Sequence, residues 1–99
     1  MKLTSSQRKY LRAQAHHIKP SVYVGKNDIV EGTFISIDNS FNARELIKVK
    51  FHDTSITDVI KETIQEKNKC DIAGSIGKTL ILYKEHSDLE KRKIKLPKY

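Results

Sequence analysis

Residues 46–51 read LIKVKF, a run in which large apolar side chains alternate with lysines from Ile47 onward. Alternation of this kind predicts a β-strand, because successive side chains of a strand point to opposite faces of the sheet. We therefore expect Ile47, Val49 and Phe51 to face the core and the two lysines to face outward. The segments on either side of this strand show helical and extended patterns that define the rest of the fold.

A helix and a short strand are predicted on the N-terminal side. Thr4 and Gln7 have the spacing of a capping box, in which a hydroxyl and an amide satisfy free backbone groups at the start of a helix. The helix should run from about Ser5 to His16, and Pro20 prevents it from continuing. Residues 21–24 then form a short predicted strand.

A second helix follows, with Asp28 at its N-cap and Glu31 as the reciprocal partner in another capping box. Its apolar residues recur at intervals of three and four positions, as they do in the buried stripe of an amphipathic helix. These residues are Val30, Phe34, Ile37 and Phe41. We expect this helix to end near Asn42.

A third helix and two strands complete the pattern. The helix should open at Ser55, with Asp58 three residues later, and it carries an apolar stripe. The residues of that stripe are Ile56, Val59, Ile60, Thr63 and Ile64. Cys70–Ile76 and Lys78–Lys84 are predicted strands that are joined through Gly77.

The order α-β-α-β-α-β-β predicts a two-layer α/β (α+β) fold, in which a four-stranded mixed sheet packs with three helices. A chain of 99 residues suits one such domain. We place the domain at residues 1–84 and a charged C-terminal tail at residues 85–99. Ile94 and Leu96 are isolated apolar points in this tail, which leaves open whether it docks weakly or stays loose.

The composition limits where the protein works. No apolar run approaches the roughly twenty residues that a membrane span needs, and the N-terminal stretch lacks the apolar region of a secretory signal. The single cysteine, Cys70, excludes an internal disulfide and fits a reducing compartment. We expect a cytoplasmic protein that has no membrane partner.

The net charge of +7 is concentrated in the first quarter of the chain. Residues 1–27 hold six Lys/Arg and no Asp or Glu, whereas the other 72 residues hold 13 basic and 12 acidic side chains. At helical spacing, Arg8, Arg12 and Lys19 form one stripe, and Lys9 lies beside it. Many charge runs are only solvated helix faces, but no acidic residue compensates this one. We therefore predict a surface that binds a polyanion.

The cationic series ends at Gly25-Lys26-Asn27-Asp28, between the first strand and the second helix. Backbone N–H groups at a helix N-terminus bind anions, and Gly25 allows close approach to the main chain. Lys26 is the predicted phosphate contact, supported by the backbone of Asn27. The alternative is that the loop is only a helix cap, formed by Asp28.

Other patterns do not predict catalysis. The stretch GSIGKT at residues 74–79 has two residues between its glycines where a Walker loop has four, and a strand pattern follows it. Its glycines suit a β-bulge and a tight turn instead. The potential metal ligands lack the spacing of a zinc site. They are His16, His17, His52, Asp53 and Cys70. We expect no enzymatic activity, metal, cofactor or small-molecule substrate.

Three blocks of sequence carry a family resemblance. They are RKYLRAQAHHIKPSVYVGKND at residues 8–28, ARELIKVKF at residues 43–51 and IGKTLILYKE at residues 76–85. Together they resemble the CRM domain (chloroplast RNA splicing and ribosome maturation) in its stand-alone bacterial YhbY-like form. The resemblance implies that residues 1–84 are an RNA-binding domain, similar in fold to the C-terminal domain of translation initiation factor three. It also implies association with precursors of the large ribosomal subunit.

The family has a GxxG loop, comparable to the loop with which KH domains clamp a nucleotide backbone, and it corresponds to Gly25–Asp28 here. This chain has Asp28 in place of the second glycine. Aspartate adopts left-handed backbone less readily and brings a carboxylate near the phosphate, although as an N-cap it is worth about 1 kcal/mol. We therefore predict RNA contacts at Gly25, Lys26 and Asn27 and treat Asp28 as a weaker candidate.

The sequence thus predicts a non-enzymatic, monomeric protein that binds large-subunit ribosomal RNA and assists ribosome assembly. Beyond the loop, the main RNA-binding candidates are Arg8, Lys9, Arg12 and Lys19. The weaker candidates are Lys48, Lys50 and Lys78, because outward lysines on strands often only protect a sheet edge. Tyr10 and Tyr23 either stack on a base or pack in the core. The alternative functions are a ribosome-associated protein–protein adaptor and a general RNA chaperone without ribosome specificity.

Overall fold

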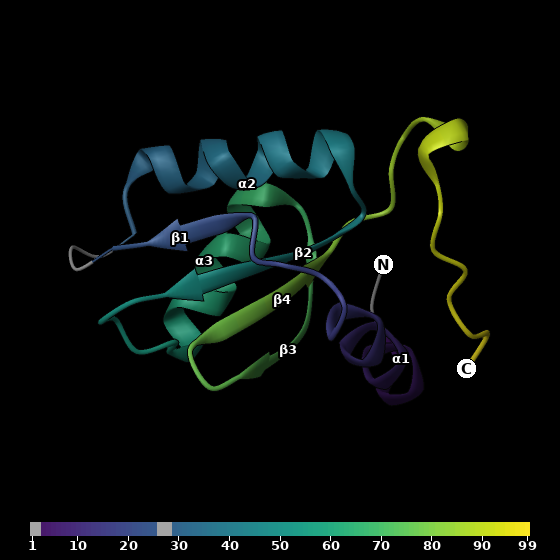
Figure 1. Cartoon of the computed structure of the whole chain (residues 1–99), viewed down its shortest axis with the longest axis horizontal. Coiled ribbons are helices and arrows are strands. Elements are labelled where there is room, and N and C mark those ends of the chain that lie inside the picture. The colour runs from purple at the N-terminus through teal and green to yellow at the C-terminus, as the bar shows by residue number, and fades with distance from the viewer. Residues whose placement is uncertain (1–2, 26–28) are drawn as a thin grey trace.

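The computed structural model of the chain describes residues 3–25 and 29–99. The helices are α1 (Ser5–Ala15), α2 (Glu31–Ala43) and α3 (Asp58–Asn68), and a short 3-10 helix, η1 (Leu89–Lys91), lies in the tail (Figure 1). The strands are β1 (Val22–Val24), β2 (Leu46–Phe51), β3 (Asp71–Ile76) and β4 (Thr79–Tyr83). The predicted α+β fold, with three α-helices and a four-stranded sheet, is confirmed.

The four strands form one mixed sheet in the order β1-β2-β4-β3. β1 is parallel to β2, whereas β4 is antiparallel to both of its neighbours. The alternation predicted for β2 is confirmed, since Ile47, Val49 and Phe51 are fully buried while Lys50 is exposed and Lys48 is half-buried. β2 is paired along both edges and therefore lies in the interior of the sheet.

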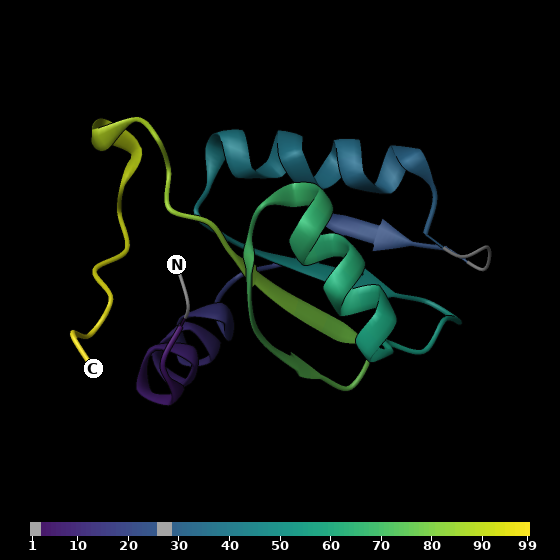
Figure 2. The same cartoon turned by 180° about the vertical axis from the view of Figure 1, so that it is seen from behind.

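The helices cover the two faces of the sheet unequally. α2 and α3 lie over one face and enclose the larger core with β1, β2 and β4 (Figure 2). α1 lies on the other face, where Leu11 and Ala15 pack with Leu46, Ile81 and Tyr83. Both views place α1 beside one end of the sheet, so the other end of that face is left uncovered. In the described ranges, no helix combines the length and the apolar character that crossing a bilayer requires.

The N-caps agree with the sequence analysis at α1 and differ from it at α3. The Thr4 hydroxyl accepts a hydrogen bond from the Gln7 N–H at 3.1 Å, and the Gln7 side chain accepts one from the Thr4 N–H at 3.0 Å. At α3 the cap is Thr57 rather than Ser55, and its hydroxyl accepts from the Ile60 N–H at 3.2 Å. Serine and threonine are both good N-caps, so a cluster of them does not specify which one begins the helix.

The prediction for the start of α2 was wrong. The helix begins at Glu31, and the extended Val30 occupies the N-cap position, where its N–H donates to the Thr33 hydroxyl at 3.3 Å. Asp28, the predicted N-cap, lies outside the described residues. Val30 and, in α3, Val59 are 58% and 71% exposed, although both were expected in buried stripes. Periodicity identifies a stripe but does not separate its centre from its margin or from the residues just before the helix.

Gly74 and Gly77 lie at a β-bulge and in a tight turn, as the sequence predicts. The register of β3 against β4 shifts between Ile72 and Gly74, which marks an irregularity of the bulge type. Gly77 has a φ of 59° in the turn between the two strands. This left-handed conformation favours glycine, because a side chain would be strained there.

The tail docks on the domain. The buried Glu45 carboxylate accepts hydrogen bonds at 2.8 to 3.1 Å from three backbone N–H groups of the tail. These groups belong to His86, Lys93 and Ile94. Ile94 and Leu96 pack on the α1 side of the sheet, and the Gln7 side-chain amide donates to the Pro97 carbonyl at 2.8 Å. Of the two alternatives that the sequence left open, the structure shows docking.

Candidate nucleic-acid interface

Three chain segments meet at the end of the sheet where β1 and β2 both finish, on the left in Figure 1. The Val24 carbonyl accepts a hydrogen bond from the His52 N–H at 2.9 Å. The Lys78 carbonyl accepts one from the Phe51 N–H at 2.7 Å. Gly25 follows β1 directly, so these bonds bring Gly25, His52 and Lys78 to one place although they are distant in sequence.

A row of side chains crosses all four strands at this end. The pairing register aligns Tyr23 of β1 with Lys50 of β2. Lys50 is aligned in turn with Thr79, and Thr79 with Ile76. Paired residues of neighbouring strands project to the same face of a sheet. Because Val24, next to Tyr23, is buried in the core under α2, the row lies on the opposite face. We call Tyr23, Lys50, Thr79 and Ile76 the cross-strand row.

The cross-strand row lies on the part of this face that α1 leaves uncovered. Tyr23 is 69% exposed and Ile76 is 51% exposed. Lys50 is exposed as well, and Thr79 is half-buried between its neighbours. The row therefore presents an aromatic ring, an ammonium group, a hydroxyl and an aliphatic side chain to solvent.

Two hollows flank Gly25. One has a volume of about 370 Å³ and lies beside the cross-strand row. It is lined by Tyr23, Val24, Gly25, Lys50 and His52. The other has a volume of about 320 Å³ and extends from β1 to the first turn of α2. Gly25 is exposed, and a Cβ added to it would meet no atom within 4 Å. Packing inside the protein therefore does not require glycine at this position.

The cations beside Gly25 are available to a ligand. We use "the loop end" for Tyr23, Gly25, Lys50, His52 and Lys78. Lys50 and Lys78 are both exposed, and the Lys78 ammonium donates to the His52 carbonyl at 3.0 Å. In the part of the chain that the structure describes, neither lysine forms an ion pair with a carboxylate. Lys48, the third of the weaker candidates, is half-buried two residues before Lys50.

The two arginines of α1 bind groups of the protein itself. The Arg8 guanidinium donates to the Leu3 carbonyl at 2.8 Å and to the Ser5 hydroxyl at 3.2 Å. The Arg12 guanidinium donates to the Ala73 carbonyl at 3.0 Å. Both side chains are half-buried. Each arginine therefore has a structural role, one at the start of α1 and the other where α1 packs on β3.

Lys9 of α1 and Lys19, in the link between α1 and β1, are both exposed, but α1 lies away from Gly25. α1 packs on Leu46, Ile81 and Tyr83, and Ile81 is paired with Lys48, whereas Gly25 lies beyond the end of the sheet where β2 finishes, at Phe51. The three residue steps from Lys48 to Phe51 span about 10 Å. The structure thus does not join the cations of α1 and Gly25 into the continuous surface that the sequence suggested.

The remaining predicted contacts divide into two groups. Lys26, Asn27 and Asp28 lie outside the described residues, and their phosphate contacts stay predictions. Of the two tyrosines, Tyr10 is half-buried against the α1 side of the core, whereas Tyr23 is exposed at the loop end. The structure therefore leaves Tyr23 as the ring that is free to stack on a base.

Sequence reasoning missed several residues of this region. Thr79 and Ile76 were not selected, and His52 was considered as a metal ligand or a catalytic residue but not as an RNA contact. The sequence of β4 gives no alternation that would mark Thr79, because the four residues that follow it are all large, apolar or aromatic, and buried. The alignment of Thr79 with Lys50 and Ile76 depends on the strand register, which the sequence does not show directly.

Cys70, one of the potential metal ligands named from the sequence, is a buried free cysteine. Burial, together with the nearby charge of Asp71, raises the pKa of the Cys70 thiol to about 12. Such a thiol stays protonated near neutral pH and is a poor nucleophile and a poor metal ligand. Within residues 3–25 and 29–99, no group of three or more His, Cys, Asp or Glu side chains is placed to hold a metal ion.

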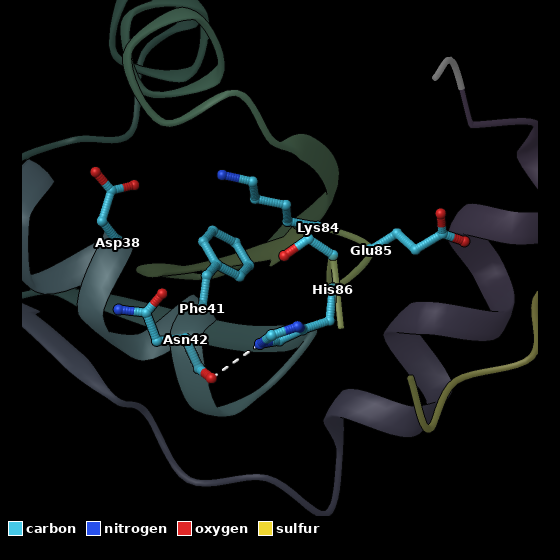
Figure 3. A pocket seen from close by; sticks show the side chains of 7 residues that line it. Asp38, Phe41, Asn42, Lys84, Glu85 and His86 are labelled. Carbon is cyan, nitrogen blue, oxygen red and sulfur yellow. Dashed lines mark hydrogen bonds between the residues drawn. The ribbon is translucent and has the colours of Figure 1, made fainter. Parts of the chain in front are cut away.

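A hollow of about 410 Å³ lies between the end of α2 and the start of the tail (Figure 3). It is lined by Asp38, Phe41, Asn42, Lys84, Glu85, His86 and Ser87. The His86 ring bonds the Asn42 carbonyl through Nε2 at 2.9 Å, and its Nδ1 accepts from the Asp88 N–H at 2.9 Å. The Lys84 ammonium donates to the Asn68 carbonyl at 3.3 Å. These bonds tie the start of the tail to α2 and α3, so we assign the hollow to tail docking.

Comparison with known proteins places the chain in a family. The model of the CRS1 / YhbY (CRM) domain matches residues 3–84. The chain is 36% identical over 98 residues to a Haemophilus influenzae protein named as an RNA-binding protein, covering 97% of this chain and 96% of that one. It is 34% identical over 97 residues to the probable RNA-binding protein YqeI of Bacillus subtilis, covering 96% and 99%. The solution structure of a hypothetical protein from Staphylococcus aureus matches with a TM-score of 0.79 and 33% identity, covering 96% and 99%. The chain therefore belongs to the CRS1 / YhbY (CRM) domain family.

Proposed function

We propose that this protein binds RNA at the loop end and assists the assembly of the large ribosomal subunit. The observation that carries the RNA proposal is the pair of exposed lysines, Lys50 and Lys78, beside the exposed Gly25. Relatives that match nearly the whole chain are named as RNA-binding proteins, which supports the same ligand. The large-subunit proposal rests on the resemblance to the bacterial YhbY-like form of the domain.

Each group at the loop end suits a part of the RNA backbone. Lysine ammonium groups bind phosphate as point charges. At Gly25 neither the surrounding atoms nor a left-handed φ requires glycine. The missing side chain instead leaves room for a phosphate to reach the main chain. We include Lys26 and Asn27 in this contact, as the sequence predicts.

The cations near the start of the chain act differently from those at the loop end. Arg8 and Arg12 are held by hydrogen bonds within the protein, while Lys9 and Lys19 are exposed. With a net charge of +7, the protein attracts a polyanion over a distance, and these four residues contribute to that attraction. The protein acts by binding alone, as a cytoplasmic monomer, and no residue is assigned a catalytic role.

The proposal is tested by sedimenting a cell lysate through sucrose gradients at low and high salt, with the protein detected in each fraction. At low salt we expect the protein in particles close to the large subunit. At high salt we expect it at the top, because phosphate contacts weaken steeply with salt. A protein that stays at the top of the gradient at low salt would contradict the ribosomal proposal.

Two matched double variants identify the surface. Lys50→Glu with Lys78→Glu reverses two charges at the loop end and should abolish the association. Lys95→Glu with Lys98→Glu makes the same charge change at exposed positions of the tail and should retain most of it. Equal loss in both variants would show that only net charge matters. Association that survives both the loop-end reversal and high salt would favour a protein–protein adaptor.

A further inference from the structure

We infer that the loop end binds unpaired RNA bases, with Tyr23 as the ring on which one base stacks. The inference rests on the proposed function, since it specifies which form of RNA that site takes. It is carried by the cross-strand row and by the hollow next to it, both of which the tertiary structure assembles. A surface that recognised only duplex phosphates would need cations but no exposed ring.

Tyr23 is an exposed residue between two buried ones. Its neighbours Val22 and Val24 are 5% and 3% exposed, whereas Tyr23 itself is 69% exposed. The strand therefore holds the Tyr23 backbone firmly while the ring lies on an uncovered part of the sheet. A ring fixed in this way gives a base a stacking partner at little cost in side-chain entropy, because tyrosine has two χ angles.

The other residues of the cross-strand row lie beside the Tyr23 ring. Neighbouring strands are about 4.8 Å apart, so the row from Tyr23 to Ile76 extends about 14 Å over four strands. Ile76, which is 51% exposed, offers an apolar contact to a second base, and Lys50 lies between the two ends of the row. The Thr79 hydroxyl can both donate to and accept from a base edge.

The site has a polar edge at the end of β1. The hollow of about 370 Å³ is lined by Tyr23 and Lys50 on the sheet and by Gly25 at the end of β1. A base that stacks on Tyr23 therefore has its sugar and phosphate near Gly25 and the Lys50 ammonium. Proteins that bind single-stranded nucleic acid combine aromatic rings, on which the bases stack, with cationic groups along the backbone. The loop end offers both, together with an exposed main chain at Gly25.

A paired base cannot use this site. In an A-form duplex the base faces are covered by their neighbours, and the accessible groups are phosphates, 2′-hydroxyls and base edges. The Tyr23 ring can reach a base face only where the RNA is unpaired, in a loop, a bulge or a single strand. The protein should therefore prefer single-stranded RNA to a duplex of the same length.

The absence of tryptophan from the chain allows a direct test. Tyr23→Trp places the only tryptophan of the chain at the proposed stacking position. Val59→Trp is the matched control, because Val59 is 71% exposed on α3, which covers the opposite face. Both variants are titrated with a single-stranded oligoribonucleotide and with a fully paired RNA duplex of equal length. We expect the single strand to quench Tyr23→Trp strongly, the duplex to quench it little, and Val59→Trp to respond to neither.

Affinity measurements complete the test. Tyr23→Ser should weaken binding of the single strand about tenfold, in line with the loss of one stacked base, while Tyr23→Phe should bind as the wild type does. Wild-type affinity in Tyr23→Ser, or equal quenching of Tyr23→Trp by duplex and single strand, would overturn the stacking inference and leave RNA binding intact. If the wild-type protein bound neither RNA, the proposed function would fail, and this inference with it.

Discussion

The Arg12 guanidinium donates to the Ala73 carbonyl at 3.0 Å and thereby joins α1 to β3. Its aliphatic stem lies against Gly74, where a Cβ would come within 2.7 Å of the Arg12 Cδ. A residue that the charge pattern predicts as an RNA contact is thus part of a helix–sheet contact. The cations of α1 therefore differ in role, because Arg12 holds the fold while Lys9 is exposed to solvent.

Arg12→Ala should lower the free energy of unfolding by about 1–2 kcal/mol, because it removes a partly buried hydrogen bond and the packing of the stem. Lys9→Ala, one turn away on the exposed side of α1, should change the stability by less than about 0.5 kcal/mol. Urea denaturation of both variants measures the difference. Equal stabilities would show that the contact between Arg12 and Ala73 contributes nothing to holding α1.

Gly74→Ala should affect the stability of the fold, whereas Gly25→Ala should affect RNA binding. Gly74 has a φ of 155° and no room for a Cβ beside Arg12, so Gly74→Ala should destabilise the fold. Gly25 has open space around it, so Gly25→Ala should leave the stability unchanged and weaken RNA binding instead. Thermal denaturation and RNA titration of both variants check this. A Gly25→Ala protein that binds RNA as well as the wild type would show that close main-chain approach is not needed.

The salt dependence of RNA binding should identify the phosphate contacts one at a time. For a single strand, removing one contact lowers the slope of log K against log salt by about 0.7. We expect this change for Lys50→Ala and for Lys78→Ala. Lys9→Ala should leave the slope within error of the wild type, because α1 is remote from the loop end. The same reduction in all three variants would show that RNA also runs over α1.

Glu45 should control the docking of the tail. Its Oε1 accepts from the N–H groups of Lys93 and Ile94, and its Oε2 accepts from that of His86. Glu45→Ala removes all three bonds and leaves donors without partners, so the tail should detach and unfolding should cost about 2–4 kcal/mol less. Limited proteolysis and amide exchange of residues 86–94 measure the release. Unchanged protection of this segment would show that apolar packing alone holds it.

Stability should fall at alkaline pH. Burial is the main cause that raises the pKa of Cys70 from 9.0 to about 12, and also that of Tyr83 from 10.0 to about 12. The folded state therefore binds these protons more tightly than the unfolded state. The resulting stability is complete below pH 9 and is lost as the pH rises toward 12, at about 1.4 kcal/mol per pH unit for each group. Urea denaturation between pH 7 and 10.5 measures this slope.

Cys70→Ala provides the control for the alkaline prediction. The variant should lose the part of the slope that begins near pH 9 and keep the part that begins near pH 10, which comes from Tyr83. A slope identical to that of the wild type would show that the Cys70 thiol titrates in the folded protein as it does in the unfolded chain.

The sequence determined the elements of this protein, because their signals are local. Alternation in residues 46–51 and the capping box at Thr4 each depend on side chains a few positions apart, and both appear in the structure as predicted. The sequence alone also predicted the order of the elements. The charge asymmetry and the resemblance to the CRM domain needed no structure either. Local signals gave the wrong residue where several neighbouring residues could occupy the N-cap position, as at the starts of α2 and α3.

The tertiary structure decided which cations and which ring are available to a ligand. Arg12 and Lys9 look alike in the sequence, but only the packing of α1 on β3 turns the Arg12 guanidinium toward Ala73. Tyr23 meets Lys50 because β1 and β2 pair in parallel with one particular register. Register and packing depend on contacts between residues that are distant in the chain. For that reason the loop end exists only in the folded protein, although every residue in it is visible in the sequence.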